Sequence, residues 1–161
     1  ETSPGWMMVS GNEVKDIFNY GTLTTTGVIT KSSNIGSTKI ALEIGAEPIR
    51  DVLERVGFGD VQGTGFPGER SGILPNHRRW GLHVTATFSF GYGLSATALQ
   101  LAQAYSVLAD DGIRKPVSLL KLSAKDIEAL PQEHVLNPKI VTEVKKMLAK
   151  TGATEINLKQ E

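Results

Sequence analysis

The sequence has 161 residues, 40% of them hydrophobic, and its 17 Lys and Arg residues balance 17 Asp and Glu residues, so the formal net charge is zero. This length and composition indicate one soluble globular domain, and they exclude a disordered chain and a basic nucleic-acid-binding surface. Cysteine is absent, which excludes a disulfide framework and a thiolate metal site, and no apolar run approaches the ~20 residues that a membrane-spanning helix needs.

The N-terminal part of the chain is predicted to be irregular at first and then helical. Residues 1–23 carry scattered Pro and Gly, and we expect them to be irregular or weakly extended, with a short mixed segment over Glu13–Tyr20. Helices are expected over Thr24–Thr30 and from about Asn34 to Ile44, where Gly45 provides a left-handed cap.

The next predicted helix is defined by its apolar spacing and is followed by a long loop. Pro48 stands near its start, Gly57 follows its end, and residues at helical spacing form its apolar stripe: Ile49, Val52, Leu53 and Val56. Residues 57–81 are rich in Gly and Pro, which predicts a long ordered loop or a linker.

The second half contains the strongest helix prediction, over Ala96–Asp110. We expect one apolar stripe of this helix to face the core, namely Ala98, Leu101, Ala102, Tyr105, Leu108 and Ala109. Ile113–Leu122 contains Pro116 and suits an edge strand or an extended segment. Asn137 is expected to cap a last helix that ends near Gly152, with the stripe Ile140, Val141, Val144, Met147 and Leu148. No repeat and no internal domain boundary is evident.

Three short polar residues, Ser32, Ser33 and Asn34, lie at the junction of two predicted helices. A serine hydroxyl can relay a proton, and an Asn amide both accepts and donates hydrogen bonds. Acyl transfer by a serine nucleophile needs such groups beside it. Ser and Asn are also common helix N-caps, and from the triplet alone the cap interpretation is favoured.

The neighbouring sequence changes this interpretation. Residues 23–36, Leu-Thr-Thr-Thr-Gly-Val-Ile-Thr-Lys-Ser-Ser-Asn-Ile-Gly, resemble the second active-site motif, with its flanks, of class B penicillin-binding proteins. Other segments resemble the same family in the family's order: residues 65–72, 86–93, 97–102 and 111–116. The resemblance covers roughly residues 1–148.

This resemblance implies a serine-type peptidoglycan D,D-transpeptidase of the septal cell-division type, often called penicillin-binding protein 3. The family domain is α+β and similar to serine β-lactamases, and this chain would supply its mainly helical part, with little or incomplete β-sheet. Residues 1–148 would be a partial transpeptidase domain, and residues 149–161 a tail that is a possible remnant of the family's Lys-Thr-Gly region. Such enzymes need no cofactor or metal.

The resemblance also implies the partners and the location. The family cross-links stem peptides that end in D-Ala-D-Ala, and β-lactam antibiotics acylate its nucleophile. It acts at the periplasmic face of the bacterial inner membrane, through an anchor that this sequence does not contain, beside other membrane proteins of the divisome. No nucleic acid is expected as a partner.

Particular residues take roles by the same resemblance. Ser32 would shuttle a proton, and Asn34 would bind the side-chain amide of the substrate or β-lactam. Ser33, Phe90, Tyr92 and Gly93 are expected near the substrate. For the two aromatic residues, ordinary packing around a glycine turn is the alternative, and Gly93 permits backbone angles that other residues avoid.

The sequence departs from the family at the other two motifs. The family's nucleophile motif, Ser-x-x-Lys, should precede Ser32, but the one literal match is Ser118–Lys121. We reject it as the nucleophile, because it follows Ser-x-Asn and because Ser and Lys three apart in an extended segment point to opposite faces. Lys150, Thr151 and Gly152 match the third motif; they follow a helix at once, so a C-terminal helix cap is the alternative.

We therefore predict a peptidoglycan transpeptidase that works through a serine acyl-enzyme, in which this chain lacks the nucleophile. The alternative is a catalytically inert helical subdomain with a structural or partner-binding role; a sensor of peptidoglycan or β-lactam gains no specific support. His77, His83 and His134 lack the spacing of a zinc site. Residues 63–68 have the spacing of a dinucleotide fingerprint without its strand and helix.

Overall fold

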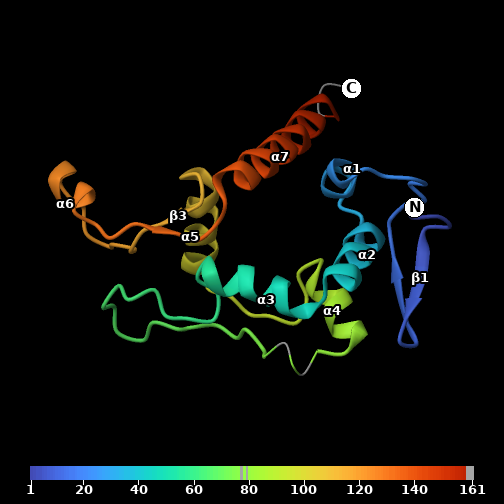
Figure 1. Ribbon diagram of the computed structural model, residues 1–161, viewed down its shortest axis with the longest axis horizontal. Helices are drawn as coiled ribbons and strands as arrows, with labels where there is room; N and C mark the ends of the chain where they lie inside the picture. The colour runs from blue at the N-terminus through green and yellow to red at the C-terminus, as the bar shows by residue number, and fades with distance from the viewer. Residues whose placement is uncertain (77, 79, 159–161) are drawn as a thin grey trace. The chain divides into compact units, whose positions relative to one another are not determined.

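The computed structural model describes residues 1–76, 78 and 80–158 (Figure 1). Its buried apolar residues form two clusters. The first unit comprises residues 1–49, 75–93 and the part of the last helix from residue 143; the second comprises residues 50–74 and 94–142. The sequence predicted a partial domain over residues 1–148 without an internal boundary, and this domain assignment stays a prediction. Each of the two units buries an apolar cluster of its own.

The first unit begins with a β-hairpin. Strands β1 (Trp6–Val9) and β2 (Asn12–Lys15) pair antiparallel, with Val9 opposite Asn12. Ser10 and Gly11 join them with φ angles of 49° and 81°, which suits the two-residue turns that favour right-twisted hairpins. The sequence predicted an irregular or weakly extended region here. The hairpin forms because the turn brings Val9 and Val14 to one buried face.

Helices α1 (Thr25–Thr30), α2 (Asn34–Ile44) and α4 (Leu82–Phe88) complete the first unit. Helix α2 lies against β2, α1 and α4. The core of the unit consists of four buried residues from the hairpin, α2 and α4, with partly buried residues around them: Val9, Val14, Ile35 and Ala86, then Met7, Leu42 and Phe90. Helices α1 and α2 confirm the sequence prediction to within a residue, whereas α4 was not predicted.

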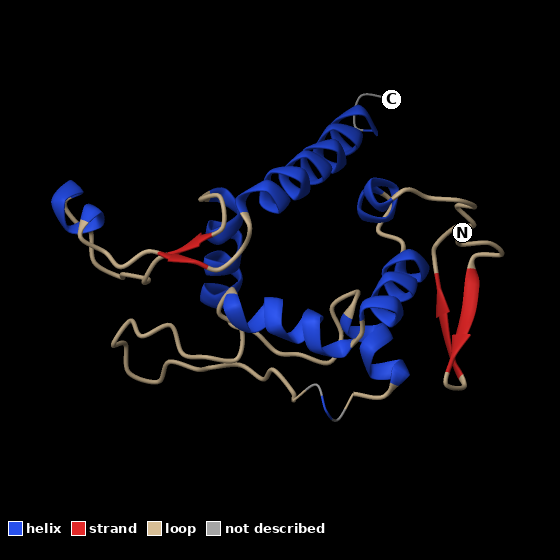
Figure 2. Ribbon diagram, in the orientation of Figure 1, coloured by secondary structure: helices blue, strands red, loops and turns tan. Residues whose placement is uncertain are grey.

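The second unit contains α5 (Ala98–Ala109), α6 (Ala124–Glu128) and a two-residue ladder of β3 (Ile113–Arg114) with β4 (Glu133–His134). Its core consists of Val56, Phe58, Val107 and Val135. Described residues between positions 57 and 81 form the long loop that the sequence predicted. Helices predominate and strands are few (Figure 2), which confirms the prediction of a mainly helical α+β part of a domain.

The buried face of α5 differs from the predicted one. Leu101 and Tyr105 are 50% and 59% exposed, whereas Gln100, Gln103 and Val107 are buried. The amide of Gln100 donates to the carbonyl oxygens of Asp60, at 2.8 Å, and Ser71, at 2.7 Å. A buried amide that is hydrogen-bonded avoids the cost of desolvation, so the helix turns glutamines toward the loop backbone.

Two helices each contain residues of both units, because the chain passes from one unit to the other within them. Helix α3 (Ala46–Arg55) has Pro48 in its first turn and carries ion pairs one helical turn apart. Helix α7 (Pro138–Leu158) begins where it was predicted but continues past Gly152, so the prediction of a helix cap at Gly152 is wrong. A glycine inside a helix costs only about 1 kcal/mol, which does not suffice to end it.

Candidate functional site

The turn between α1 and α2 carries the Ser-x-Asn motif. Ser32 has a φ of 51°, in the left-handed region that few residues other than glycine adopt. Its backbone N–H donates to the carbonyl oxygen of Ile29 at 3.1 Å. The side chain is exposed, and among the described residues no partner is found for its hydroxyl. The turn therefore presents the hydroxyl of Ser32 to solvent.

Ser33 is the N-cap of α2. Its side chain is 1% exposed, accepts from the Gly36 N–H at 2.9 Å and donates to Oδ2 of Asp16 at 2.6 Å. Oδ1 of Asp16 accepts from the Ile35 N–H at 3.0 Å. The hydroxyl of Ser33 is thus used inside the protein as the cap of α2, and the expected position of Ser33 near the substrate stays a prediction.

Asp16 is a site residue that the sequence analysis missed. It follows strand β2 directly, and its carboxylate lies at the N-terminus of α2, where negative charge is favourable. The signal in the sequence was an acidic residue ending a short alternating segment. Because the hairpin that positions Asp16 was not predicted, the sequence offered no reason to place this residue beside the Ser-x-Asn motif.

Asn34 lines a pocket of about 290 Å³ in the first unit. Its side-chain amide donates to the carbonyl oxygen of Lys15 at 3.0 Å, which orients the group against strand β2. The other lining residues come from β2, α4 and the turn after α4: Glu13, Val14, Lys15, His83, Thr87, Phe90 and Tyr92. The structure therefore brings Asn34, Phe90 and Tyr92 together, whereas Ser32 and Gly93 are not among the lining residues.

An aromatic pair forms one wall of this pocket. The rings of Phe90 and Tyr92 are 5.8 Å apart and meet edge to face at 71°, and Tyr92 is 68% exposed. Gly93 has a φ of 91°, and a Cβ there would lie 2.7 Å from the ring of Phe88. Gly93 therefore allows the turn to pass close to Phe88 and so positions the aromatic pair.

Polar side chains that the sequence analysis did not connect with the motif also border the pocket. Glu13 and Lys15 form an exposed ion pair at 3.7 Å, and Nδ1 of His83 is buried without a partner. Together with the Asn34 amide, the side chains of Glu13 and Lys15 give the pocket groups that accept and donate hydrogen bonds. Glu13 and Lys15 lie on strand β2 and His83 lies on helix α4, and neither element was predicted from the sequence.

The other predicted motifs lie elsewhere in the structure. Lys150 and Thr151 belong to α7 and not to a strand, so the role of Lys150-Thr151-Gly152 as a third motif stays a prediction. The Ser118 hydroxyl donates to the Leu120 carbonyl at 2.8 Å in an exposed loop, which agrees with our rejection of Ser118 as the nucleophile.

The described residues contain neither a cluster of metal-ligating side chains nor a membrane-spanning helix. Within residues 1–76, 78 and 80–158, no three His, Asp or Glu side chains gather as a metal site would require. His77 lies outside the described residues. In the same part of the chain, no helix combines the length and apolarity needed to span a bilayer.

Comparison with known proteins adds to this geometry. Residues 2–159 match the family described as "Penicillin binding protein transpeptidase domain". The chain is 45% identical over 149 residues to the probable peptidoglycan D,D-transpeptidase PbpC of Pseudomonas aeruginosa, covering 91% of this chain and 25% of that protein. It is 41% identical over 140 residues to the peptidoglycan D,D-transpeptidase FtsI of Escherichia coli K12, covering 87% of this chain and 23% of that protein.

Solved structures give a similar result. The TP domain of penicillin-binding protein 3 from Burkholderia pseudomallei matches with a TM-score of 0.84 and 39% identity, over 92% of this chain and 44% of that one. A peptidoglycan glycosyltransferase from Burkholderia ambifaria matches with a TM-score of 0.86 and 38% identity, over 92% of this chain and 46% of that one. The chain spans about a quarter of the length of the two curated relatives and less than half of the two solved chains.

Proposed function

The chain belongs to the penicillin-binding protein transpeptidase family, and from this membership we propose that it forms one wall of the active site of a peptidoglycan D,D-transpeptidase. One observation carries the proposal. The Ser-x-Asn motif lies at the α1–α2 turn, and its Asn34 lines the same pocket as Phe90 and Tyr92. Hydrogen bonds that this turn donates to strand β2 and to Asp16 hold it in place.

In the proposed reaction, a serine nucleophile attacks a stem peptide that ends in D-Ala-D-Ala. Its oxygen bonds to the carbonyl carbon of the first D-Ala, the peptide C–N bond breaks, and the serine proton passes to the leaving amine. The exposed hydroxyl of Ser32 relays this proton, and the amide of Asn34 holds the substrate peptide in line. The amine of a second stem peptide then attacks the same carbonyl carbon, the ester bond to the serine breaks, and the amine proton returns to the serine oxygen. A β-lactam acylates the same serine.

The nucleophile is the part of this reaction that the 161 residues do not supply. In the family, Ser-x-x-Lys precedes Ser-x-Asn, and residues 1–31 contain no such motif. The only literal match in the sequence begins at Ser118, whose hydroxyl is bonded to a loop carbonyl. We therefore propose that catalysis takes place in a longer protein that carries this chain.

The proposal is tested by acylation. After incubation with penicillin, intact mass spectrometry should show no covalent adduct on the 161-residue chain and one adduct on a longer protein that carries it. In that longer protein, Ser32→Ala should slow acylation by about 10²- to 10⁴-fold, the range typical of a lost acid–base group. Ser118→Ala is the matched control and should leave the rate unchanged.

Two results would count against the proposal. A stoichiometric adduct on any serine of the 161-residue chain would show that the nucleophile is present after all. If the Ser32→Ala and Ser118→Ala proteins are acylated at equal rates, Ser32 of the Ser-x-Asn motif does not relay the proton. A slower rate with unchanged thermal unfolding would support a role in the reaction rather than in the fold.

We also propose the setting of the reaction. The resemblance of residues 86–93 to cell-division members of the family supports septal cell-wall synthesis at the periplasmic face of the bacterial inner membrane. The partners would then include other membrane proteins of the divisome, reached through the longer protein. Similarity to a transpeptidase named FtsI supports this setting.

A further inference from the structure

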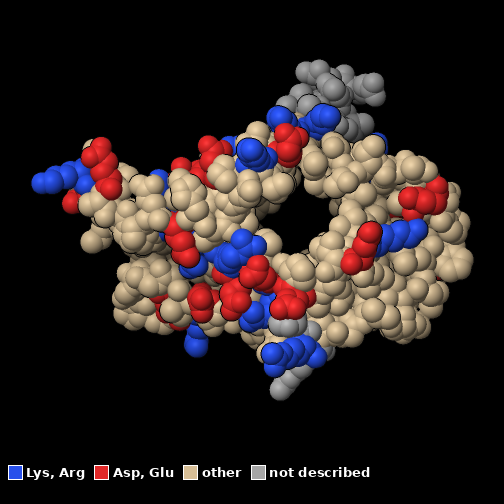
Figure 3. All heavy atoms as spheres, in the orientation of Figure 1, with Lys and Arg blue, Asp and Glu red and all other residues tan. Residues whose placement is uncertain are grey.

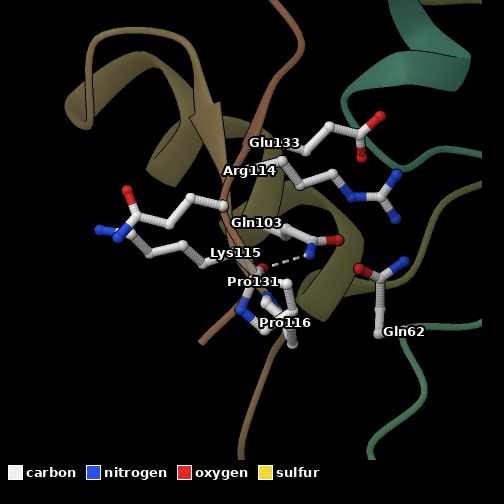
Figure 4. Close-up of a pocket in the computed structure, with 8 residues that line it drawn as sticks. Gln62, Gln103, Arg114, Lys115, Pro116, Pro131 and Glu133 are labelled. Atoms are coloured by element: carbon white, nitrogen blue, oxygen red, sulfur yellow. Dashed lines mark hydrogen bonds between the residues drawn. The ribbon is translucent and has the colours of Figure 1, made fainter. Parts of the chain in front are cut away.

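A second pocket, of about 370 Å³, lies within the second unit and has no part in the proposed reaction (Figure 4). It forms where the segments beyond β3 and before β4 pass beside α5 and the loop after α3. Its walls combine two buried amides, charged side chains and two prolines: Gln62, Gln103, Arg114, Lys115, Pro116, Pro131, Gln132 and Glu133.

Two buried amide oxygens border this pocket without a hydrogen-bond partner. Gln62 and Gln103 are 8% and 5% exposed, and Oε1 of each is both buried and unpaired. Figure 4 shows the two amide groups turned toward each other. A buried acceptor without a donor costs about 1–3 kcal/mol, so these oxygens call for N–H or O–H groups from outside the protein.

The direction of both oxygens is fixed by bonds at the other end of each amide. The nitrogen of Gln103 donates to the Lys115 carbonyl at 3.2 Å. The nitrogen of Gln62 donates to the carbonyls of Gly57 and Asp60, each at 3.1 Å. Turning either amide over would set an oxygen against a carbonyl oxygen. The oxygens must therefore be the atoms that remain unpaired.

Gln100 provides a comparison within the same unit. It is fully buried, and its nitrogen also donates to loop carbonyls. Its oxygen, however, accepts from the Thr97 N–H at 2.9 Å in the capping box of α5. In Gln100, therefore, both the nitrogen and the oxygen of a buried side-chain amide have hydrogen-bond partners within the unit. The oxygens of Gln62 and Gln103 differ because they have none.

The charges around the pocket favour a neutral ligand. Lys115 is paired with Asp110 at 2.6 Å, which leaves Arg114 and Glu133 as charges of opposite sign. A cation would meet the guanidinium of Arg114, and an anion would meet the two amide oxygens. A group that donates through nitrogen and accepts through oxygen can satisfy the glutamine oxygens and Arg114 together.

We propose that this pocket binds a carboxamide group. Its N–H groups donate to Oε1 of Gln62 and Gln103, its oxygen accepts from Arg114, and the rings of Pro116 and Pro131 contact the carbon chain that carries it. Either a small free amide or the amide of a polypeptide offers this chemistry.

Three probes of the same size test the ligand class on the ¹⁵N-labelled 161-residue chain: propionamide, propionate and propylammonium. We expect propionamide to shift the side-chain NH₂ signals of Gln62 and Gln103 saturably while the signals of Gln100 stay in place. Its affinity should exceed that of each charged probe by about tenfold or more, because an unpaired charge is costly in a partly desolvated pocket. A blocked Ala-Gln-Ala peptide, with Ala-Glu-Ala as its control, distinguishes a polypeptide amide from a small free amide. Binding of Ala-Gln-Ala that is tighter than binding of propionamide indicates a polypeptide ligand.

Two variants test the assigned contacts. Arg114→Met should lower the affinity for propionamide by about tenfold, since a hydrogen bond to a charged group is lost. Glu133→Gln removes the negative charge and should raise the affinity for propionate relative to propionamide. Backbone amide spectra establish that each variant is folded, and the wild-type titration decides the question should Arg114→Met not fold.

Several results would overturn the proposal. Gln62 and Gln103 signals that do not respond to propionamide would show that water alone fills the pocket. If propionate or propylammonium binds as tightly as propionamide, the pocket does not select a carboxamide. If folded Arg114→Met binds propionamide with unchanged affinity, Arg114 does not contact the oxygen of the ligand amide.

Discussion

Asp16 orients the Ser-x-Asn motif although it lies outside it. Its carboxylate accepts from the Ser33 hydroxyl at 2.6 Å and from the Ile35 N–H at 3.0 Å, and both partner residues are 1% exposed. Bonds to an ionised acceptor are short and strong. The adjoining carbonyl of Lys15 accepts from Asn34. The end of strand β2 thus holds both Ser33 and Asn34.

Removal of this carboxylate should destabilise the chain. Asp16→Ala leaves a buried hydroxyl and a buried N–H without acceptors, and we expect the free energy of unfolding to fall by about 2–3 kcal/mol, as measured by urea denaturation. Glu13→Ala, in the adjoining strand β2, is the control; its exposed ion pair predicts a change within about 0.5 kcal/mol. Equal effects of the two substitutions would contradict the role given to Asp16.

The sequence revealed the motif residues but not the residues that hold them. Ser33 could be recognised as a possible N-cap because such caps are local. Asp16 acts 17 residues away along the chain, so its role depends on tertiary structure. The same reason explains the buried Gln100 of α5, whose partners lie 29 to 43 residues away along the chain.

At the scale of elements, Gly36 allows α2 to approach α1 closely. A Cβ at Gly36 would lie 2.5 Å from Cγ2 of Val28, a buried residue of α1. We expect Gly36→Ala to lower the thermal stability, at a cost of about 1–3 kcal/mol from overpacking, although Ala is the better helix former. In Gly27→Ala the new Cβ meets the flexible tip of Leu23 at 3.2 Å, so this control should be neutral or stabilising. If both variants are equally stable, close packing is not what requires Gly36.

Helix α6 depends on its capping box and should respond to pH. The Ser123 hydroxyl donates to Asp126 at 2.6 Å, and this bond and the Ser123 backbone N–H hold the pKa of Asp126 below its ordinary value. A lowered pKa means that the carboxylate stabilises α6 above the ordinary pKa of Asp, and that this stability is lost as pH falls through the folded value. In Ser123→Ala, NMR titration should show the pKa of Asp126 moving up. An unchanged pKa would contradict the capping box.

Element length explains much of which helices the sequence could predict, although α1, with six residues, was predicted as well. Helices α2, α5 and α7 have 11, 12 and 21 residues, enough turns to show a period or clear end signals. Helices α4 and α6 have seven and five residues, too few for a hydrophobic period. The hairpin strands have four residues each, too few to show a clear alternation, and they were not predicted.

At the scale of the whole molecule, the division into two units could not be read from the sequence. The first cluster combines Val9 and Val14 with Ala86, and the second combines Phe58 with Val135. Neither set is contiguous, because the chain leaves the first unit at residue 50 and returns to it at residue 75. Composition gave only the total apolar content, which one core or two cores satisfy equally.

The balance of charge predicts how the whole chain associates. The isoelectric point is about 7.1, and on the face drawn in Figure 3 basic and acidic side chains are interspersed. Without net repulsion, exposed apolar side chains such as Ile17 and Leu120, which are 83% and 81% exposed, can bring copies together. Light scattering at low salt should therefore be greatest near pH 7 and fall at pH 5 and pH 9. Leu120→Lys should reduce scattering at pH 7 without changing stability, whereas scattering that is independent of pH would show that net charge does not control association.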